Sequence, residues 1–475
     1  MFQDYSDIFR ESPYVRYINR WNLEKKDPTK RLSKPKKPIV YWLENTIPNE
    51  FRAAIREGIL AWNEAFEAIG FKDAIVVKQM PDDANWDPAD IRYSTIRWIV
   101  QPGSAYAVGP SRANPYTGEI YDADIRVSAD YVRFYFNDFV EFVYPTTQNT
   151  FSESINLEEN YQHSGHSDCS YGESMMKNLS FSWNRFFGKK EISDQEREKK
   201  LQSFIHDALV DLLLHEVGHT LGLRHNFKAS SVYSLEQLRN SKFTSENGTT
   251  GSVMDYNATN LLDGGVTFFQ TKPGPYDYWA IEYAYSELPV NYAMSEGYFL
   301  NEIASKSTDP LLVYGTDEDT YGTSLRSIDP YTSSRDLSSD PIGFYNQQLN
   351  LVENFWEEML VDFEINGERY PRFKRIFVGG LWEYYRAARN VSKFVGGIKH
   401  SRHHIGEKEE TPMVVVSAKE QRRAIKFLND RIVASDVFDF SPELLNKLAP
   451  ERLDDFKDSV WDMSRLDFPI HSIIK

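Results

Sequence analysis

Three histidines and one glutamate lie close together between residues 215 and 225, where the sequence reads HEVGHTLGLRH. On a helix of about 3.6 residues per turn, His215 and His219 project from one face, so both imidazoles can bind a single metal ion. The same turn holds Glu216 beside that ion. The spacing therefore predicts a zinc site with a carboxylate base next to it.

The third ligand requires a sharp turn after this helix. A straight helix cannot place another imidazole for tetrahedral coordination, and Gly222 is the residue type that enters the left-handed conformation without strain. We therefore expect Gly222 to turn the chain and His225 to return to the metal. The chain has a single cysteine, Cys169, which excludes a cysteine-rich metal cluster and leaves histidines and carboxylates as ligands.

Charge and hydropathy argue against two classes of partner. With 54 Lys and Arg against 70 Asp and Glu, the net charge of -16 repels phosphate backbones, so nucleic acid is not an expected partner. No stretch reaches the roughly 18 consecutive apolar residues that a membrane span needs. The first residues have neither the basic nor the apolar region of a signal peptide, so none is expected in this chain. The oligomeric state is not indicated.

The segments before residue 130 predict a sheet and a helix that could position this site. Runs rich in β-branched and aromatic residues predict strands at 39–43, 74–77, 91–100 and 124–127, and apolar residues recur at helical spacing from Pro48 to Gly70. A later helix, apolar nearly all round and so expected to be buried, leads into the zinc motif. This order predicts a twisted mixed sheet with a long backing helix and a zinc-binding helix.

Helical periodicity dominates beyond residue 300, at 342–363, 370–394, 417–432 and from 442 onward. We therefore predict an α+β protein with three parts: an N-terminal arm (1–37), a domain that carries the metal site (38–300) and a mainly α-helical C-terminal domain (301–475). Residues 131–192 are rich in aromatic and then polar residues, which is typical of an insertion.

A methionine-containing turn follows the zinc motif, at Ser252-Val253-Met254-Asp255-Tyr256. The long zinc motif followed by such a turn resembles the metzincin zinc metallopeptidases. The resemblance implies that Met254 forms an apolar floor beneath the three histidines and that Tyr256 approaches the metal and stabilises the transition state. It makes 38–300 a metzincin-like catalytic domain, in which 106–110 lie near the edge strand that binds extended peptide and 274–281 belong to the C-terminal helix.

The same resemblance implies a zinc-dependent endopeptidase that cleaves extended polypeptides, with one catalytic zinc ion and Glu216 as the general base. The whole chain is similar to large bacterial zinc-dependent metallopeptidases with a helical C-terminal extension, which implies export to the periplasm or outside the cell. An alternative is a peptide- or protein-binding module on a peptidase fold with little or no turnover. Glu216 favours the enzyme, because a pure binder has no need of a base beside the metal.

Two further patterns are weaker metal candidates. The acidic residues at 317–319 and 336–340 could bind calcium, although a solvated, helix-capping surface is the interpretation that we favour. His163, His166 and Cys169 could form a second zinc site, but polar loops often contain such clusters. No pattern indicates the natural substrate or the preferred cleavage site.

Overall fold

The computed structural model describes residues 2–132, 194–362 and 364–474, except for 7, 8, 10, 11, 101–106, 130, 263–266, 290, 291, 293, 321–326, 365, 368, 369, 409, 410 and 450–466. The predicted insertion therefore lies almost entirely outside the described residues. The second zinc site suggested for His163, His166 and Cys169 lies outside them as well.

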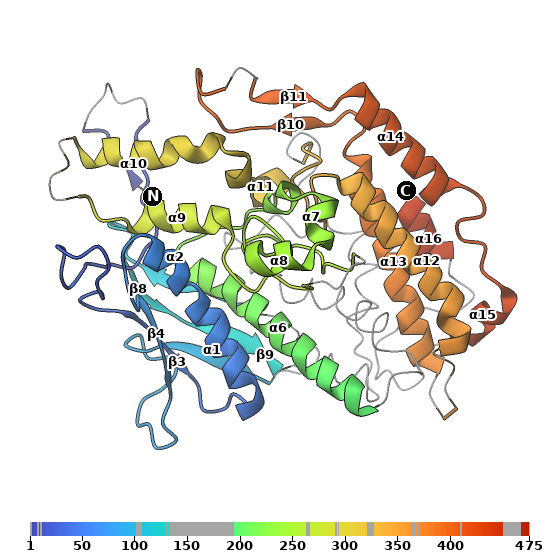
Figure 1. Ribbon diagram of the computed structural model, residues 1–475, viewed down its shortest axis with the longest axis horizontal. Coiled ribbons are helices and arrows are strands. Elements are labelled where there is room, and N and C mark those ends of the chain that lie inside the picture. The colour runs from blue at the N-terminus through green and yellow to red at the C-terminus, as the bar shows by residue number, and fades with distance from the viewer. Residues whose placement is uncertain are drawn as a thin grey trace.

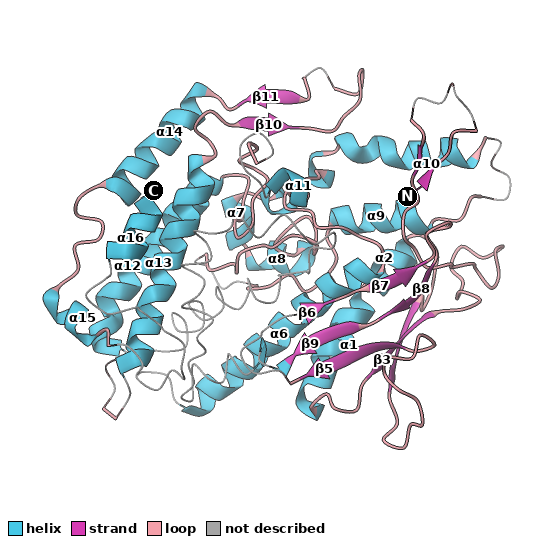
Figure 2. Cartoon of the chain, turned by 180° about the vertical axis from the view of Figure 1, so that it is seen from behind, coloured by secondary structure: helices cyan, strands magenta, loops and turns pink. Residues whose placement is uncertain are grey.

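A five-stranded mixed sheet lies in the N-terminal part of the chain (Figure 2). Its strands, in spatial order, are β4 (Ile75–Gln79), β3 (Ile39–Leu43), β5 (Ser94–Ile99), β9 (Ile125–Ser128) and β6 (Ala107–Val108). The first four strands are parallel, and β6 pairs antiparallel with β9, with Ala107 opposite Val127. The mixed sheet is confirmed, and β3, β4, β5 and β9 lie where the sequence pattern predicts strands.

Three helices pack together beside the sheet: α1 (Arg52–Ala61), α2 (Asn63–Ala68) and the long α6 (Asp194–Thr220), which ends in the zinc motif (Figure 1). The close approach of α1 to α6 depends on Gly58. A Cβ atom at this position would lie only 2.7 Å from the carbonyl oxygen of Val210 in α6. A glycine in the middle of α1 is therefore explained by helix packing rather than by helix propensity.

The single long helix predicted from Pro48 to Gly70 is interrupted, so that prediction is wrong at Trp62. The turn is tighter there: the Trp62 carbonyl accepts from the Ala65 amide, three residues later, over 3.1 Å as well as from the Phe66 amide over 3.3 Å. The Trp62 side chain is completely buried, and its indole Nε1 donates to the carbonyl oxygen of Leu214 in α6 over 3.0 Å. The break thus coincides with a contact to the zinc helix.

A second hydrophobic core is built mainly by helices from the C-terminal part of the chain, to the right in Figure 1. These are α12 (Pro341–Asp362), α13 (Tyr370–Ser392), α14 (Ala418–Leu428), a π-helical turn at Asn429–Val433, α15 (Pro442–Lys447) and α16 (Asp467–Ile474). Leu238 and Leu261 also belong to this core, although they precede residue 300. The domain boundary at 300 stays a prediction.

A β-hairpin that is not among the predicted elements interrupts these helices. Its strands, β10 (Ile398–His400) and β11 (Met413–Val415), pair antiparallel. All three residues of β11 are exposed, although an apolar run of this kind is typical of a buried strand. The hairpin extends over the upper side of the molecule in Figure 1.

The remaining elements are short. They are β1 (Phe2–Gln3), β2 (Tyr14–Val15), β7 (Ser111–Ala113), β8 (Ile120–Ala123), α7 (Leu235–Arg239), α8 (Ser241–Asn247), α9 (Pro275–Tyr285), α10 (Glu296–Ala304) and α11 (Asp317–Thr320), with several 3₁₀ turns. None of the described helices is long and apolar enough to cross a membrane. Export stays a prediction.

Candidate metal centre

The three histidines of the zinc motif converge on one point. His219 Nε2 lies 3.2 Å from His215 Nε2 and 3.1 Å from His225 Nε2. His215 and His225 are buried, and His219 is partly exposed. Among the described residues, this is the grouping of histidine, cysteine and acidic side chains with the geometry to hold a metal ion.

Each imidazole is oriented by a hydrogen-bond acceptor at its other nitrogen. The Nδ1 atoms lie 2.7 Å from the carbonyl oxygen of Val253 for His215, 3.1 Å from that of Leu223 for His219, and 2.8 Å from Asp317 Oδ1 for His225. A proton on Nδ1 leaves Nε2 as the metal-binding atom. All three side chains therefore present the nitrogen that faces the common point.

This donor set fits a zinc ion. Two nitrogens at ordinary zinc–imidazole distance in tetrahedral geometry lie about 3.3 Å apart, close to the separations found here. Burial, followed by the charges of the neighbouring imidazoles, holds the pKa of His215 well below its ordinary value, and burial lowers the pKa of His219 to about 3. Both rings are therefore neutral near pH 7, which is the form that binds zinc.

The turn that brings His225 back is made by Gly222, as predicted. Its φ of +97° lies in the left-handed region. Packing of the N-terminal arm also requires glycine at this position, because a Cβ atom at Gly222 would lie 1.9 Å from the carbonyl oxygen of Asn19. Nearby, the indole of Trp21 donates to the carbonyl oxygen of Thr220, the last residue of α6, over 2.9 Å. The arm thus contacts both the end of the zinc helix and the turn after it.

Met254 lies beneath the zinc helix and is completely buried. A Cβ atom at Gly218 would lie 2.3 Å from Met254 Sδ, so the thioether occupies the space that a larger residue between His215 and His219 would need. The amide of Asn226 donates to the carbonyl oxygen of Met254 over 2.9 Å. The residue after the third histidine therefore ties the methionine turn to the zinc loop.

Asp277 in α9 fixes the same turn from the other side. Its carboxylate accepts hydrogen bonds from the Ser252 hydroxyl (2.6 Å), the Val253 amide (2.8 Å) and the Gly274 amide (2.7 Å). Val253 in turn offers its carbonyl oxygen to His215. Nothing in the sequence marks Asp277 as a site residue, since its partners precede it by up to 25 residues.

Tyr256 lies beside two of the histidines. Its ring centroid is 4.8 Å from that of His225 and 5.5 Å from that of His215, and the side chain is 2% exposed. Arg335 covers it, with the guanidinium carbon 5.6 Å from the ring centroid and its backbone amide donating to the Tyr256 carbonyl. Arg335, like Asp277, gives no recognisable signal in the sequence.

Glu216 is completely buried at the junction of the zinc helix and the sheet edge. Gly109, directly after β6, packs against it. A Cβ atom at Gly109 would lie 2.5 Å from the Glu216 carbonyl oxygen and 3.3 Å from its Oε2. The last strand of the sheet and the carboxylate predicted as the general base are therefore neighbours.

The acidic residues at 317–319 do not form a common cluster. Each carboxylate has a different protein partner, and the pairs are His225–Asp317, Arg224–Glu318 and Arg402–Asp319. In the second acidic group, Asp336 accepts from the Ser230 hydroxyl and Asp340 pairs with Arg423. Binding of calcium to these residues stays a prediction.

Comparison with known protein families assigns the chain to one of them. A family model described as Met-zincin matches residues 197–475, which is more than half of the chain. The chain belongs to the Met-zincin family. No match is found among curated proteins or among solved structures. The resemblance to metzincins inferred from the zinc motif and the methionine turn is thereby confirmed.

The Met-zincin match begins inside α6 and runs to residue 475. It contains the histidine triad and the methionine turn, and also the helices of the second core. In this Met-zincin, the residues that surround the triad come from both parts of the matched region, since Asp317 and Arg335 follow residue 300. The family implies the fold of a zinc-dependent peptidase.

Proposed function

We propose that this Met-zincin is a zinc-dependent endopeptidase that hydrolyses peptide bonds of extended polypeptides. The observation that carries the proposal is the convergence of the three imidazoles. His219 Nε2 lies within 3.2 Å of the Nε2 atoms of both His215 and His225, and Glu216 is buried in the same helix. In this proposal His215, His219 and His225 hold one zinc ion. Held by these three neutral imidazoles, a zinc ion would lower the pKa of a water molecule to about 7 and polarise a carbonyl group.

The chain's own groups supply the proton transfers. Glu216 accepts a proton from the attacking water and delivers it to the leaving amine, a contribution worth roughly 10²- to 10⁴-fold in rate. Tyr256 donates a hydrogen bond to the oxygen that becomes negatively charged. The position of its ring near His215 and His225, and the Arg335 guanidinium against its face, support this role.

The substrate is proposed to bind along β6. This strand ends the described sheet and is followed by Gly109, which contacts Glu216. An extended polypeptide that pairs with the outer edge of such a strand places its backbone carbonyls next to the carboxylate. Recognition through backbone hydrogen bonds fits an enzyme that accepts polypeptides of varied sequence.

The competing function is a peptide-binding module that has kept the fold without turnover. The two are separated by incubating the zinc-loaded protein with denatured casein, with and without a chelator, alongside the Glu216→Gln variant. The endopeptidase predicts fragments that disappear with the chelator, and a variant that keeps its zinc but loses at least 10²-fold in rate. Intact casein, together with saturable peptide binding, would establish the module instead.

A further inference from the structure

We propose that Asp317 is a positioning residue for the zinc ligand His225, and that helix α11 makes the C-terminal part of the chain a component of the metal centre. The inference rests on the proposed zinc site. It concerns a carboxylate 92 residues away from the histidine that it contacts. Its role is to hold the ligand and not to touch the substrate.

The contact between the two side chains has the geometry of an orienting hydrogen bond. His225 Nδ1 and Asp317 Oδ1 are 2.8 Å apart, and the two side chains are 7% and 20% exposed. A carboxylate at Nδ1 fixes the tautomer, turns the ring toward the metal and increases the basicity of Nε2. His215 and His219 use backbone carbonyls for the same purpose, so His225 is the ligand of the three whose acceptor is a charged side chain.

Backbone pairing sets the register that brings Asp317 to His225. The amide of Phe227 donates to the carbonyl oxygen of Gly315 over 2.7 Å. Asn226 adds two contacts, with its Nδ2 donating to the Val313 carbonyl and its Oδ1 accepting from the Gly315 amide. The two residues after His225 are thus bonded to the segment before α11, which places Asp317 opposite the imidazole.

Arg224 does not account for the position of Asp317. Its Nη2 lies 2.8 and 2.9 Å from the two carboxylate oxygens of Glu318 but 3.6 Å from Asp317 Oδ2. Arg224 Nη2 therefore hydrogen-bonds to Glu318, and the shortest contact of Asp317 is the one to His225. Both Arg224 and Glu318 are more than half exposed, so their ion pair contributes little to stability.

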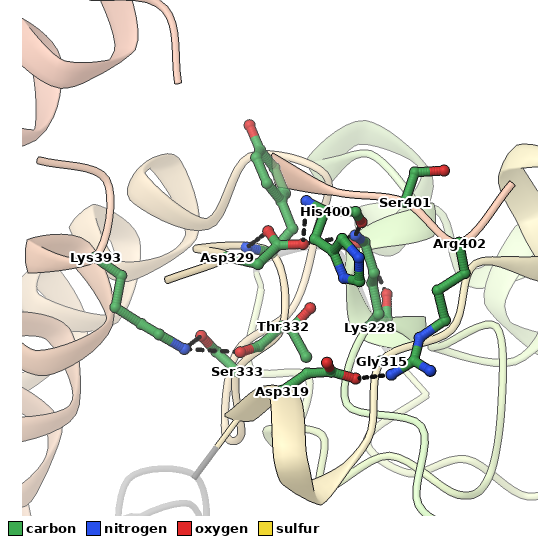
Figure 3. Close-up of polar contacts among 12 residues, drawn as sticks. Lys228, Gly315, Asp319, Asp329, Thr332, Ser333, Lys393, His400, Ser401 and Arg402 are labelled. Atoms are coloured by element: carbon green, nitrogen blue, oxygen red, sulfur yellow. Dashed lines mark hydrogen bonds and ion pairs between the residues drawn. The ribbon is translucent and has the colours of Figure 1, made fainter. Parts of the chain in front are cut away.

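The hairpin β10–β11 contacts both α11 and the loop after His225 (Figure 3). Arg402 donates to Asp319 Oδ2 over 2.6 Å, and the same carboxylate oxygen accepts from the Thr316 amide at the start of α11. Next to it, Lys228 bonds to Asp329 and to the carbonyl oxygen of His400. Residues 400–402 therefore connect the loop after His225 with α11.

The inference predicts a specific loss of zinc affinity. The variants are Asp317→Ala, which removes the acceptor, Asp317→Asn, which keeps its shape, and Glu318→Gln as the matched control on the same helix. Zinc affinity is measured on the full chain by competition with a chromogenic chelator. We expect a loss of about 10- to 100-fold for Asp317→Ala, a smaller loss of at least fivefold for Asp317→Asn, and less than a twofold change for Glu318→Gln.

Two further readouts separate positioning from general stability. The melting temperatures of the metal-free proteins should agree for Asp317→Asn and Glu318→Gln, and the visible absorption bands of the cobalt-substituted protein should change only for Asp317→Asn. Equal zinc affinities for these two variants would overturn the inference. A wild-type chain that binds no zinc would instead overturn the proposed function, so the two failures are distinguishable.

Discussion

The carbonyl oxygen of Val253 accepts a hydrogen bond from His215 Nδ1 over 2.7 Å. The methionine turn is therefore bonded directly to the first zinc ligand, and Met254 packs under the helix between that ligand and the next. Because Asp277 fixes the amide of the same Val253, the orientation of His215 depends on a chain of contacts that ends in α9.

Replacing Met254 by alanine should destabilise the protein without removing zinc. The side chain is completely buried against Gly218, so its loss leaves a cavity worth about 2–5 kcal/mol in the free energy of unfolding. The backbone bond to His215 remains. Chemical denaturation measures the effect, and Met413→Ala, at a 52% exposed position, is the control with an expected change below about 0.5 kcal/mol. Equal effects for both methionines would contradict the packing described here.

Gly222→Ala should lower the free energy of unfolding by more than the strain of the left-handed conformation alone would. Gly222 and Gly367 have nearly the same φ, +97° and +95°, but a Cβ atom meets the Asn19 carbonyl at 1.9 Å in the first case and no atom within 4 Å in the second. Gly367→Ala therefore measures the backbone cost, about 1 kcal/mol. We expect a larger loss of unfolding free energy for Gly222→Ala, together with weaker zinc binding. A loss no larger than that of Gly367→Ala would show that the arm does not press on the turn.

Gly109→Ala should reduce peptidase activity while zinc stays bound. The new Cβ atom would collide with the Glu216 carbonyl oxygen and displace β6 or the carboxylate, whereas the histidines are untouched. We expect at least a tenfold decrease in kcat/KM at unchanged zinc stoichiometry, since small misplacements of a reacting group are costly. Gly297→Ala in α10, where the nearest atom is 3.9 Å away, is the control. Full activity of Gly109→Ala would show that the contact between β6 and Glu216 has no part in catalysis.

The stability of the protein should carry a pH-dependent contribution from Asp336. Burial raises the pKa of this carboxyl to about 7, although the hydrogen bond from Ser230 acts to lower it. Burial also raises the pKa of the neighbouring Asp255, and the charge of Asp336 raises it further. A folded-state pKa above the ordinary value of 3.8 means that the folded state holds the extra proton between the two values. This stabilisation is fully present below about pH 4 and is lost as the pH rises through about 7.

Urea denaturation of wild type and Asp336→Asn at several pH values tests this sign. The variant keeps a neutral acceptor for Ser230, so its unfolding free energy relative to wild type should increase by on the order of 2 kcal/mol between pH 5 and pH 7. The comparison cancels the opposite contribution of the buried histidines, whose lowered pKa values favour folding as the pH rises. A difference that does not change with pH would contradict the raised pKa.

The parts of the site that follow from local geometry could be predicted from the sequence. His215 and His219 are one helical turn apart in any α-helix, and the left-handed Gly222 follows from the need to end that helix before His225. Strands such as β3 could be predicted because a short run of β-branched and aromatic residues marks them in the sequence. In each of these cases a few neighbouring residues determine the structure.

The contacts that complete the site could not be predicted, because they join distant segments. Asp317 belongs to an acidic run that is equally typical of a solvated surface, and only the fold brings it to His225. The regular helical pattern is interrupted at Trp62, where the indole bonds to another helix. The apolar run that forms β11 is typical of a strand, but the sequence shows neither its exposure nor its pairing with β10.

The most direct test of the zinc centre is anomalous diffraction at the zinc absorption edge from crystals grown with zinc. The structure predicts one peak at about 2.0–2.1 Å from the Nε2 atoms of His215, His219 and His225, with the fourth position open to solvent or substrate. No peak at the triad, or a protein side chain as permanent fourth ligand, would contradict the proposal that this Met-zincin is a peptidase.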